Sequence, residues 1–109
     1  MLSPPFYNLK SMCTEYFIQI TLKSSQGIEC VGKFNIGNDK ETAAALFRKL
    51  QGRPDVNDTD VLYVEFMGIK NGLPYNLDVI SCTLKELGEN CQLIIIELFK
   101  LKSLSLTAK

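Results

Sequence analysis

Four cysteines are the most reactive side chains of this sequence, and their spacing limits the chemistry that they can support. They stand at positions 13, 30, 82 and 91. No two are close enough to form the Cys-x-x-Cys pair of a zinc or redox site. The first residues lack the basic segment and apolar stretch of a signal peptide, so we expect a cytoplasmic chain with reduced thiols. We predict structural cysteines, with a ligand-binding or thiol-dependent cavity near Cys30 and Cys82 as the alternative.

Metal and acid–base chemistry have little support in the residue types present. The chain contains no histidine, which excludes Ser–His and Cys–His nucleophile pairs and removes the commonest metal ligand. The acidic segment 55–60 resembles the start of a calcium loop. Asp60 stands where such a loop needs glycine, however, and Phe66 stands where it needs a bidentate Glu. We therefore predict a solvated loop, no metal or other cofactor, and no enzymatic activity.

The charge balance argues against two classes of partner. Lys and Arg together number 12, as do Asp and Glu, so no overall field attracts nucleic acid or an anionic membrane. The basic residues Arg48, Lys49 and Arg53 cluster at the end of a predicted helix, where cations compensate the helix dipole. The longest aliphatic run, 93–96, is far too short to span a bilayer. We expect neither nucleic acid nor a membrane as a partner.

Composition and length predict one globular domain. The chain has 109 residues, of which 46% are hydrophobic and 22% charged. Residues 1–13 carry two prolines and little pattern, so they are predicted to be a flexible leader. Residues 14–101 form the predicted domain, and residues 102–109 a flexible or partly strand-like tail.

The first half of this domain is predicted to be a hairpin followed by a helix. Apolar residues alternate over 16–23 and 28–36, and the turn signal Ser-Ser-Gln-Gly joins the two runs. Gly32 indicates a bulge in the second strand. Asn38 or Asp39 is expected to cap a helix whose apolar positions recur at helical spacing: Ala43, Leu46, Phe47 and Leu50. Gly52 is then expected as its C′ residue.

The second half is predicted to contain three more strands and one helical turn. Residues 61–67 alternate as a strand, and Asn71-Gly72 is a strong hairpin turn leading to a short edge strand over 73–80. Thr83 and Glu86 have the spacing of a capping box, so one helical turn is expected, with Gly88 as its stop. Residues 91–101 contain four aliphatics in succession, which predicts a central strand buried on both faces.

This order of elements resembles the ubiquitin-like β-grasp family. The segments that carry the resemblance are 16–23, 39–50, Val64-Glu65-Phe66-Met67-Gly68, Thr83-Leu84-Lys85-Glu86-Leu87 and Leu93-Ile94-Ile95-Ile96. The resemblance implies an α+β fold: a β-grasp roll with a mixed four- to five-stranded sheet and one helix packed on one face. The rival ferredoxin-like fold needs a full second helix before the last strand, and residues 81–88 are too short to supply it.

The resemblance also limits the function. The modifiers and sulfur carriers of the family act through a C-terminal Gly-Gly, which this chain lacks, and its cysteines do not fit the spacing of plant-type iron–sulfur ferredoxins. Glu65 occupies the position that matches an exposed Ile of ubiquitin's binding patch, so ordinary ubiquitin receptors are doubtful partners. The resemblance thus implies a non-conjugated interaction module.

One helix covers only one face of such a sheet, so the other face is predicted to bind a protein, including a second copy of the chain. The candidate residues on that face are Phe17, Val31, Tyr63, Met67, Ile94 and Ile96. The alternative occupant is the leader or the tail of the same chain. The likeness to the family implies that Leu93 and Ile95 face inward, although both sides of the segment 91–101 are apolar and the residues alone leave the buried side open.

Overall fold

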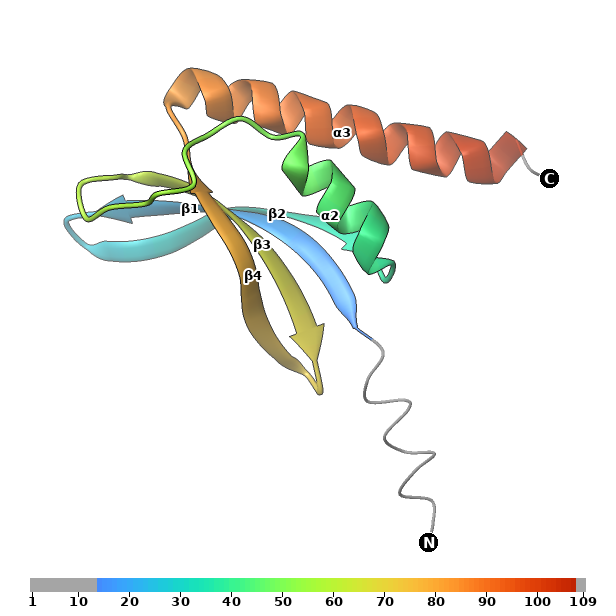
Figure 1. Cartoon of the computed structure of the whole chain (residues 1–109), viewed down its shortest axis with the longest axis horizontal. Helices are drawn as coiled ribbons and strands as arrows, with labels where there is room; N and C mark the ends of the chain where they lie inside the picture. Colours follow the sequence, from blue (N-terminus) through green and yellow to red (C-terminus); the bar gives the residue numbers. More distant parts are fainter. Residues whose placement is uncertain (1–13, 108–109) are drawn as a thin grey trace, which may run out of the picture.

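The computed structural model describes residues 14–107, and the side chains of residues 14–102. The elements follow in the order β1 (Glu15–Ser24), β2 (Gly27–Gly37), α2 (Lys40–Arg48), β3 (Leu62–Lys70), β4 (Leu73–Ser81) and α3 (Leu84–Thr107). Both helices lie on the same face of a four-stranded antiparallel sheet (Figure 1). The predicted α+β class is confirmed. No helix within residues 14–107 is long and apolar enough to cross a membrane.

The two predicted hairpins are confirmed. β1 pairs with β2 through the turn at residues 25–26, and the register shifts next to Gly32, where a bulge was expected. β3 pairs with β4 through Asn71 and Gly72, whose φ angles of 56° and 80° are those of a type I′ turn. Both hairpins therefore form from local turn chemistry that the sequence displays.

The order of the strands differs from the one expected. The strands lie in the order β2-β1-β3-β4, and β1 pairs directly with β3, with Ile18 opposite Phe66 and Ile20 opposite Val64. A mixed sheet with the last segment as a central strand is therefore wrong for this chain. The pairing of β1 with β3 leaves no place between them for another strand.

The segment 91–101 is helical, so its prediction as a strand is wrong. It belongs to α3, which has 24 residues and continues through Gly88, where a stop was expected. The predicted capping box does begin this helix. Thr83 Oγ1 accepts a hydrogen bond from the Glu86 amide at 3.1 Å, and Glu86 Oε1 accepts one from the Thr83 amide at 2.9 Å. The expected tail also changes, because residues 102–107 continue α3. The leader, 1–13, lies outside the described residues.

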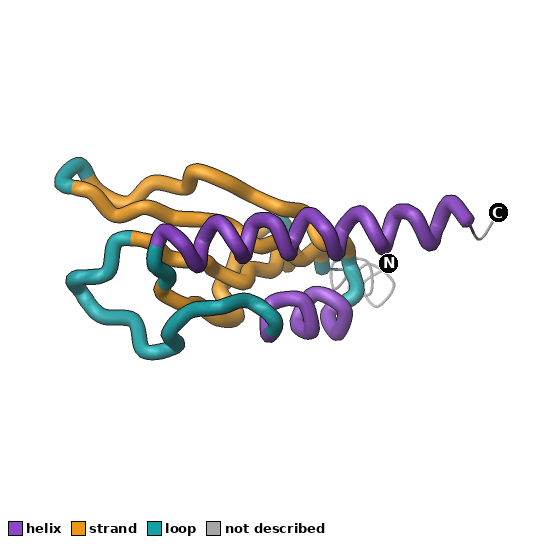
Figure 2. The backbone as a smooth tube through the Cα atoms, turned by 90° about the horizontal axis from the view of Figure 1, so that it is seen from above, coloured by secondary structure: helices purple, strands orange, loops and turns teal. Residues whose placement is uncertain are grey.

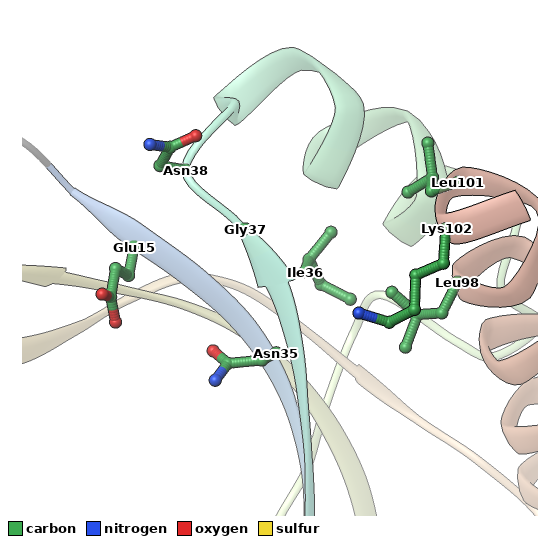
Figure 3. A pocket seen from close by; sticks show the side chains of 8 residues that line it. All are labelled: Glu15, Asn35, Ile36, Gly37, Asn38, Leu98, Leu101 and Lys102. Carbon is green, nitrogen blue, oxygen red and sulfur yellow. The ribbon is translucent and has the colours of Figure 1, made fainter. Parts of the chain in front are cut away.

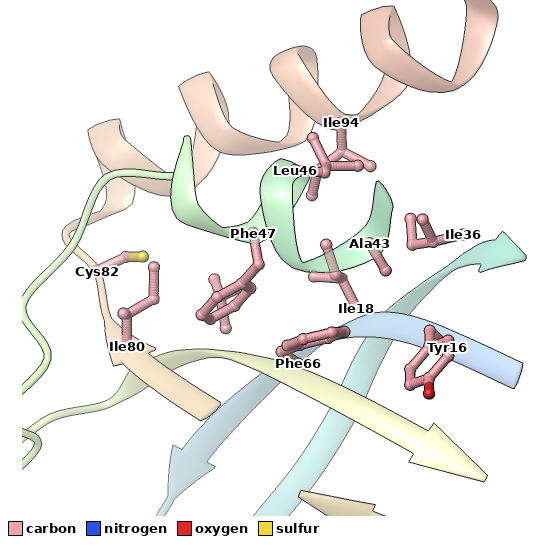
Figure 4. Packing of buried hydrophobic residues seen from close by; sticks show 11 residues of the cluster. Tyr16, Ile18, Ile36, Ala43, Leu46, Phe47, Phe66, Ile80, Cys82 and Ile94 are labelled. Carbon is pink, nitrogen blue, oxygen red and sulfur yellow. The ribbon is translucent and has the colours of Figure 1, made fainter. Parts of the chain in front are cut away.

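The core lies between the sheet and the two helices (Figures 2 and 4). Phe47 of α2 stacks on Phe66 of β3 with ring centroids 5.5 Å apart. Ile94 of α3 is fully buried and lies next to Leu46 of α2. The cluster of buried residues comprises Tyr16, Ile18, Ile36, Ala43, Leu46, Phe47, Val64, Phe66, Ile80, Cys82 and Ile94. The long helix thus completes the core by covering α2 and the end of β4.

The ends of α2 differ in detail from the expectation. Asp39 is the N-cap residue, but its side chain bonds no backbone amide; its carboxylate accepts a hydrogen bond from the Thr42 hydroxyl instead. The helix ends at Arg48, before the predicted C′ position at Gly52. Glycine is needed there for close packing, because a Cβ at Gly52 would lie 2.8 Å from the carbonyl oxygen of Ser81.

Candidate functional site

The six residues predicted to form one binding face do not share a surface, and one of them, Ile94, is fully buried. Phe17, Tyr63 and Met67 lie on the outer face of the sheet, opposite the helices, with Phe17 and Met67 directly paired. Val31, the bulge residue of β2, is 51% exposed. The other two, Ile94 and Ile96, belong to α3 on the helix side. The structure therefore brings together only the strand residues of the predicted site.

The outer face of the sheet is less apolar than its sequence suggests. Phe17 is only 3% exposed, and Lys33 Nζ lies over its ring at 4.2 Å from the centroid. Tyr63 and Met67 are half-buried, and the Tyr63 hydroxyl donates a hydrogen bond to the Asp60 carbonyl oxygen at 2.8 Å. These side chains are engaged within the chain, so they leave little free apolar surface for a partner.

A polar cluster occupies the middle of this outer face. Glu65 Oε1 accepts hydrogen bonds from Gln19 Nε2 at 2.6 Å and from Thr21 Oγ1 at 2.8 Å. A shallow cavity of about 350 Å³ begins beside this cluster. Its lining is partly apolar and comprises Thr21, Lys23, Ile28, Tyr63, Glu65, Val79 and the loop residues 56–58. Because Glu65 Oε1 accepts hydrogen bonds from two residues of β1, the cluster joins β3 to β1 and stabilises the sheet.

The acidic loop is held by its own backbone and by arginine. Asp60 accepts a hydrogen bond from the Asn57 amide at 2.8 Å and pairs with Arg53. The hydrogen bond from that amide is the main reason why the pKa of Asp60 lies below its usual value. Within the described part of the chain, no group of three or more His, Cys, Asp or Glu side chains could hold a metal ion. Lys49 of the predicted basic cluster likewise pairs with Glu97, at 3.4 Å.

The two cysteines of the alternative thiol site lie on opposite sides of the sheet. Cys30 is exposed, and its Sγ lies 3.7 Å from Gln19 Oε1, a side chain of the outer face. Cys82 belongs to the buried core beneath α3 and donates a hydrogen bond to the Gln51 carbonyl oxygen at 3.2 Å. Burial raises the pKa of the Cys82 thiol to about 11, so this thiol is protonated at neutral pH and is a poor nucleophile.

Sequence reasoning missed the role of Asn90, a buried polar residue of α3. Its Oδ1 accepts a hydrogen bond from the Gln51 amide at 2.8 Å, and its Nδ2 donates one to the Gln51 carbonyl oxygen at 2.8 Å. Nδ2 also lies 3.3 Å from Cys82 Sγ. One side chain thereby joins α3 to the loop after α2 and to the end of β4. The sequence did contain a signal for this role, because Asn90 stands among apolar residues at helical spacing. The signal was overlooked because residues 91–101 were predicted to be a strand.

The largest exposed apolar side chains of α3 lie on the side turned away from the core. Ile95 is 56% exposed, Ile96 43% and Phe99 71%. At 3.6 residues per turn, Ile95 and Phe99 line up with Leu84 and Gly88 near the start of the helix. We call these four residues, Leu84, Gly88, Ile95 and Phe99, the outer stripe of α3. Of the four successive aliphatics that suggested a strand, the core uses Ile94, while Ile95 and Ile96 are left largely in water.

The C-terminal part of α3 extends beyond the end of the sheet (Figures 1 and 2). Below it a groove of about 470 Å³ separates Leu98 and Leu101 of α3 from Ile36 and Asn35 of β2 (Figure 3). This groove is continuous with the core through the half-buried Leu98. The helix therefore carries apolar side chains on two sides at the end that protrudes.

Comparison of the chain with models of protein families, with curated proteins and with solved structures finds no match.

Proposed function

We propose that this domain is a non-enzymatic protein-binding module that docks its partner on the outer stripe of α3. The observation that carries the proposal is the exposure of Leu84, Ile95 and Phe99, the three apolar side chains of this stripe. Full burial of a side chain of this size stabilises a complex by about 1.5–3 kcal/mol. Contiguous apolar side chains on a helix are the usual recognition feature of a helix that binds in a groove or beside another helix.

The way in which α3 is anchored supports this proposal. The capping box fixes the first turn, Asn90 ties the next turns to the loop after α2, and Ile94 is fully buried. The stripe is therefore displayed by a helix that is already formed and attached. Binding to this preformed helix therefore costs less free energy of ordering than binding to a flexible segment of the same sequence would.

The outer face of the sheet, which sequence analysis favoured, supports binding less well. Phe17 is buried, and Glu65 accepts hydrogen bonds from Gln19 and Thr21. The likeness to ubiquitin-like modules no longer supports the proposal either, because the strand order of this sheet differs from theirs. The function proposed is the same, an interaction module, but the surface is the helix.

Site-specific photo-crosslinking tests the proposal. Phe99 is replaced by p-benzoylphenylalanine in the full chain, produced in its source cells, and the control carries the same photoreactive residue in place of Val31. Val31 is 51% exposed, so it is accessible as Phe99 is, but it lies on β2. We expect a defined covalent adduct to protein from position 99 and none from position 31. No adduct from position 99, or the same adducts from both positions, would contradict the proposal.

A further inference from the structure

We infer that the partner on the outer stripe is a second copy of this chain, with two α3 helices packed antiparallel about a two-fold axis. In this pairing Phe99 of each copy fills the space above Gly88 of the other. The inference rests on the proposed function and specifies its partner.

Gly88 is the first observation that points to this arrangement. Glycine inside a helix destabilises it by about 1 kcal/mol relative to alanine. A Cβ placed on Gly88 would meet nothing within 4 Å, so no contact within the described chain requires glycine there. The absent side chain leaves a hollow in the outer stripe, open to the outside.

Phe99 has the matching shape on the same stripe. Its side chain is the largest in the stripe and is 71% exposed. It follows Gly88 by eleven residues, which is three helical turns or about 16 Å along the helix axis. Both positions therefore lie nearly on one line, with a hollow at one end of it and an aromatic ring at the other.

A two-fold axis converts this line into a self-complementary surface. We place the axis between the two helices, perpendicular to both, at the level midway between residues 93 and 94. Position 88 of one copy then lies opposite position 99 of the other. The same operation repeats the contact, so two rings fill two hollows. It also places Ile95 of one copy opposite Gln92 of the other. A parallel pair would instead set ring against ring and leave both hollows empty.

The charges beside the stripe agree with the antiparallel direction. Glu89 and Lys100 lie along the same flank of α3 and are also eleven residues apart. Antiparallel helices bring like flanks together, so Glu89 of one copy faces Lys100 of the other. The Lys100 side chain is 64% exposed, and its Nζ lies 3.6 Å from Glu97 Oε2, which leaves it accessible to a second carboxylate. The chain has no net charge, so copies do not repel one another at long range.

Sedimentation velocity of the full chain over a concentration series tests the inference, with single variants and their combination. We expect wild type to form a dimer. Gly88→Phe sets ring against ring, and Phe99→Ala leaves the hollow empty, so each should raise the dimer dissociation constant by about tenfold or more. The double variant restores a ring opposite a small residue in both contacts. Its dissociation constant should therefore return to within about threefold of wild type.

The outcomes separate this inference from the proposed function. A dimer whose double variant is as weak as the singles would overturn the Phe99–Gly88 pairing. A monomeric wild type, together with an adduct from position 99 to a different protein, would overturn self-association and leave the binding module intact. A monomeric wild type without any adduct from position 99 would overturn both. Far-UV circular dichroism of each variant controls for loss of the helix.

Discussion

At the scale of single residues, the amide of Asn90 joins segments that are 39 positions apart in the sequence. It is buried and satisfies both the amide and the carbonyl group of Gln51. A buried backbone group without a partner is costly, so this side chain acts as a structural link that a hydrophobic residue could not replace.

We expect Asn90→Ala to lower the free energy of unfolding by about 1–3 kcal/mol, because both Gln51 groups lose their partner. Urea denaturation followed by circular dichroism, at protein concentrations where the chain is monomeric, measures the change. Lys85→Ala, at an exposed position of the same helix, is the matched control and should change stability by less than about 0.5 kcal/mol. Equal effects of the two substitutions would show that the link is energetically unimportant.

At the scale of elements, local signals were predictable from sequence, whereas the type of the last element was not. The Asn71-Gly72 turn, the bulge at Gly32 and the capping box at Thr83 each act through neighbouring residues, and all three are present. The segment 91–101 was misread because Ile95 and Ile96 are apolar without being in the core. Their presence concealed the helical spacing of the residues that face the core: the buried Asn90 and Ile94 and the partly buried Leu87 and Leu98.

In the candidate site, the placement of Ile94 and Ile96 beside the strand residues was wrong for the same reason. Its strand residues, Phe17, Tyr63 and Met67, were placed correctly on one face, since that depends only on alternation along β1 and β3. Ile94 and Ile96 were assigned to the same face because side chains two residues apart point to the same side of a strand. In a helix the same spacing puts them on nearly opposite sides.

Alanine substitutions at Ile94 and at Ile96 distinguish a helix from a strand over this segment. Ile94 is fully buried and Ile96 is 43% exposed, so Ile94→Ala should cost about 2–4 kcal/mol of stability, and Ile96→Ala much less. A strand with both side chains on one face would give similar values. Chemical denaturation of the two variants provides the measurement, and similar losses at both positions would contradict the helix.

At the scale of the whole molecule, both helices lie on one face of the sheet, and five of the ten large apolar side chains that stay exposed among the described residues belong to α3. On the outer face of the sheet Lys33 lies over Phe17 and Glu65 has partners on β1, whereas the apolar side chains of the outer stripe of α3 are exposed.

If the stripe joins two copies, stability depends on concentration. A dimer that dissociates on unfolding is stabilised by mass action, so the thermal midpoint of wild type should rise as protein concentration increases. For Gly88→Phe, whose dimer is weaker, the midpoint should be lower than that of wild type at each concentration where the wild type is dimeric. Differential scanning calorimetry at several concentrations measures both. A midpoint of wild type that is independent of concentration would argue against the dimer.

The direct pairing of β1 with β3 also has a consequence for how the chain reaches this structure. Each hairpin closes through a tight turn, a step that takes microseconds, but Ile18 finds Phe66 only after a long loop that contains α2 has closed. Such non-local pairing is the slow part of folding in small domains. The rate-limiting barrier should therefore be the joining of two preformed hairpins, with α3 adding its contacts after the sheet is complete.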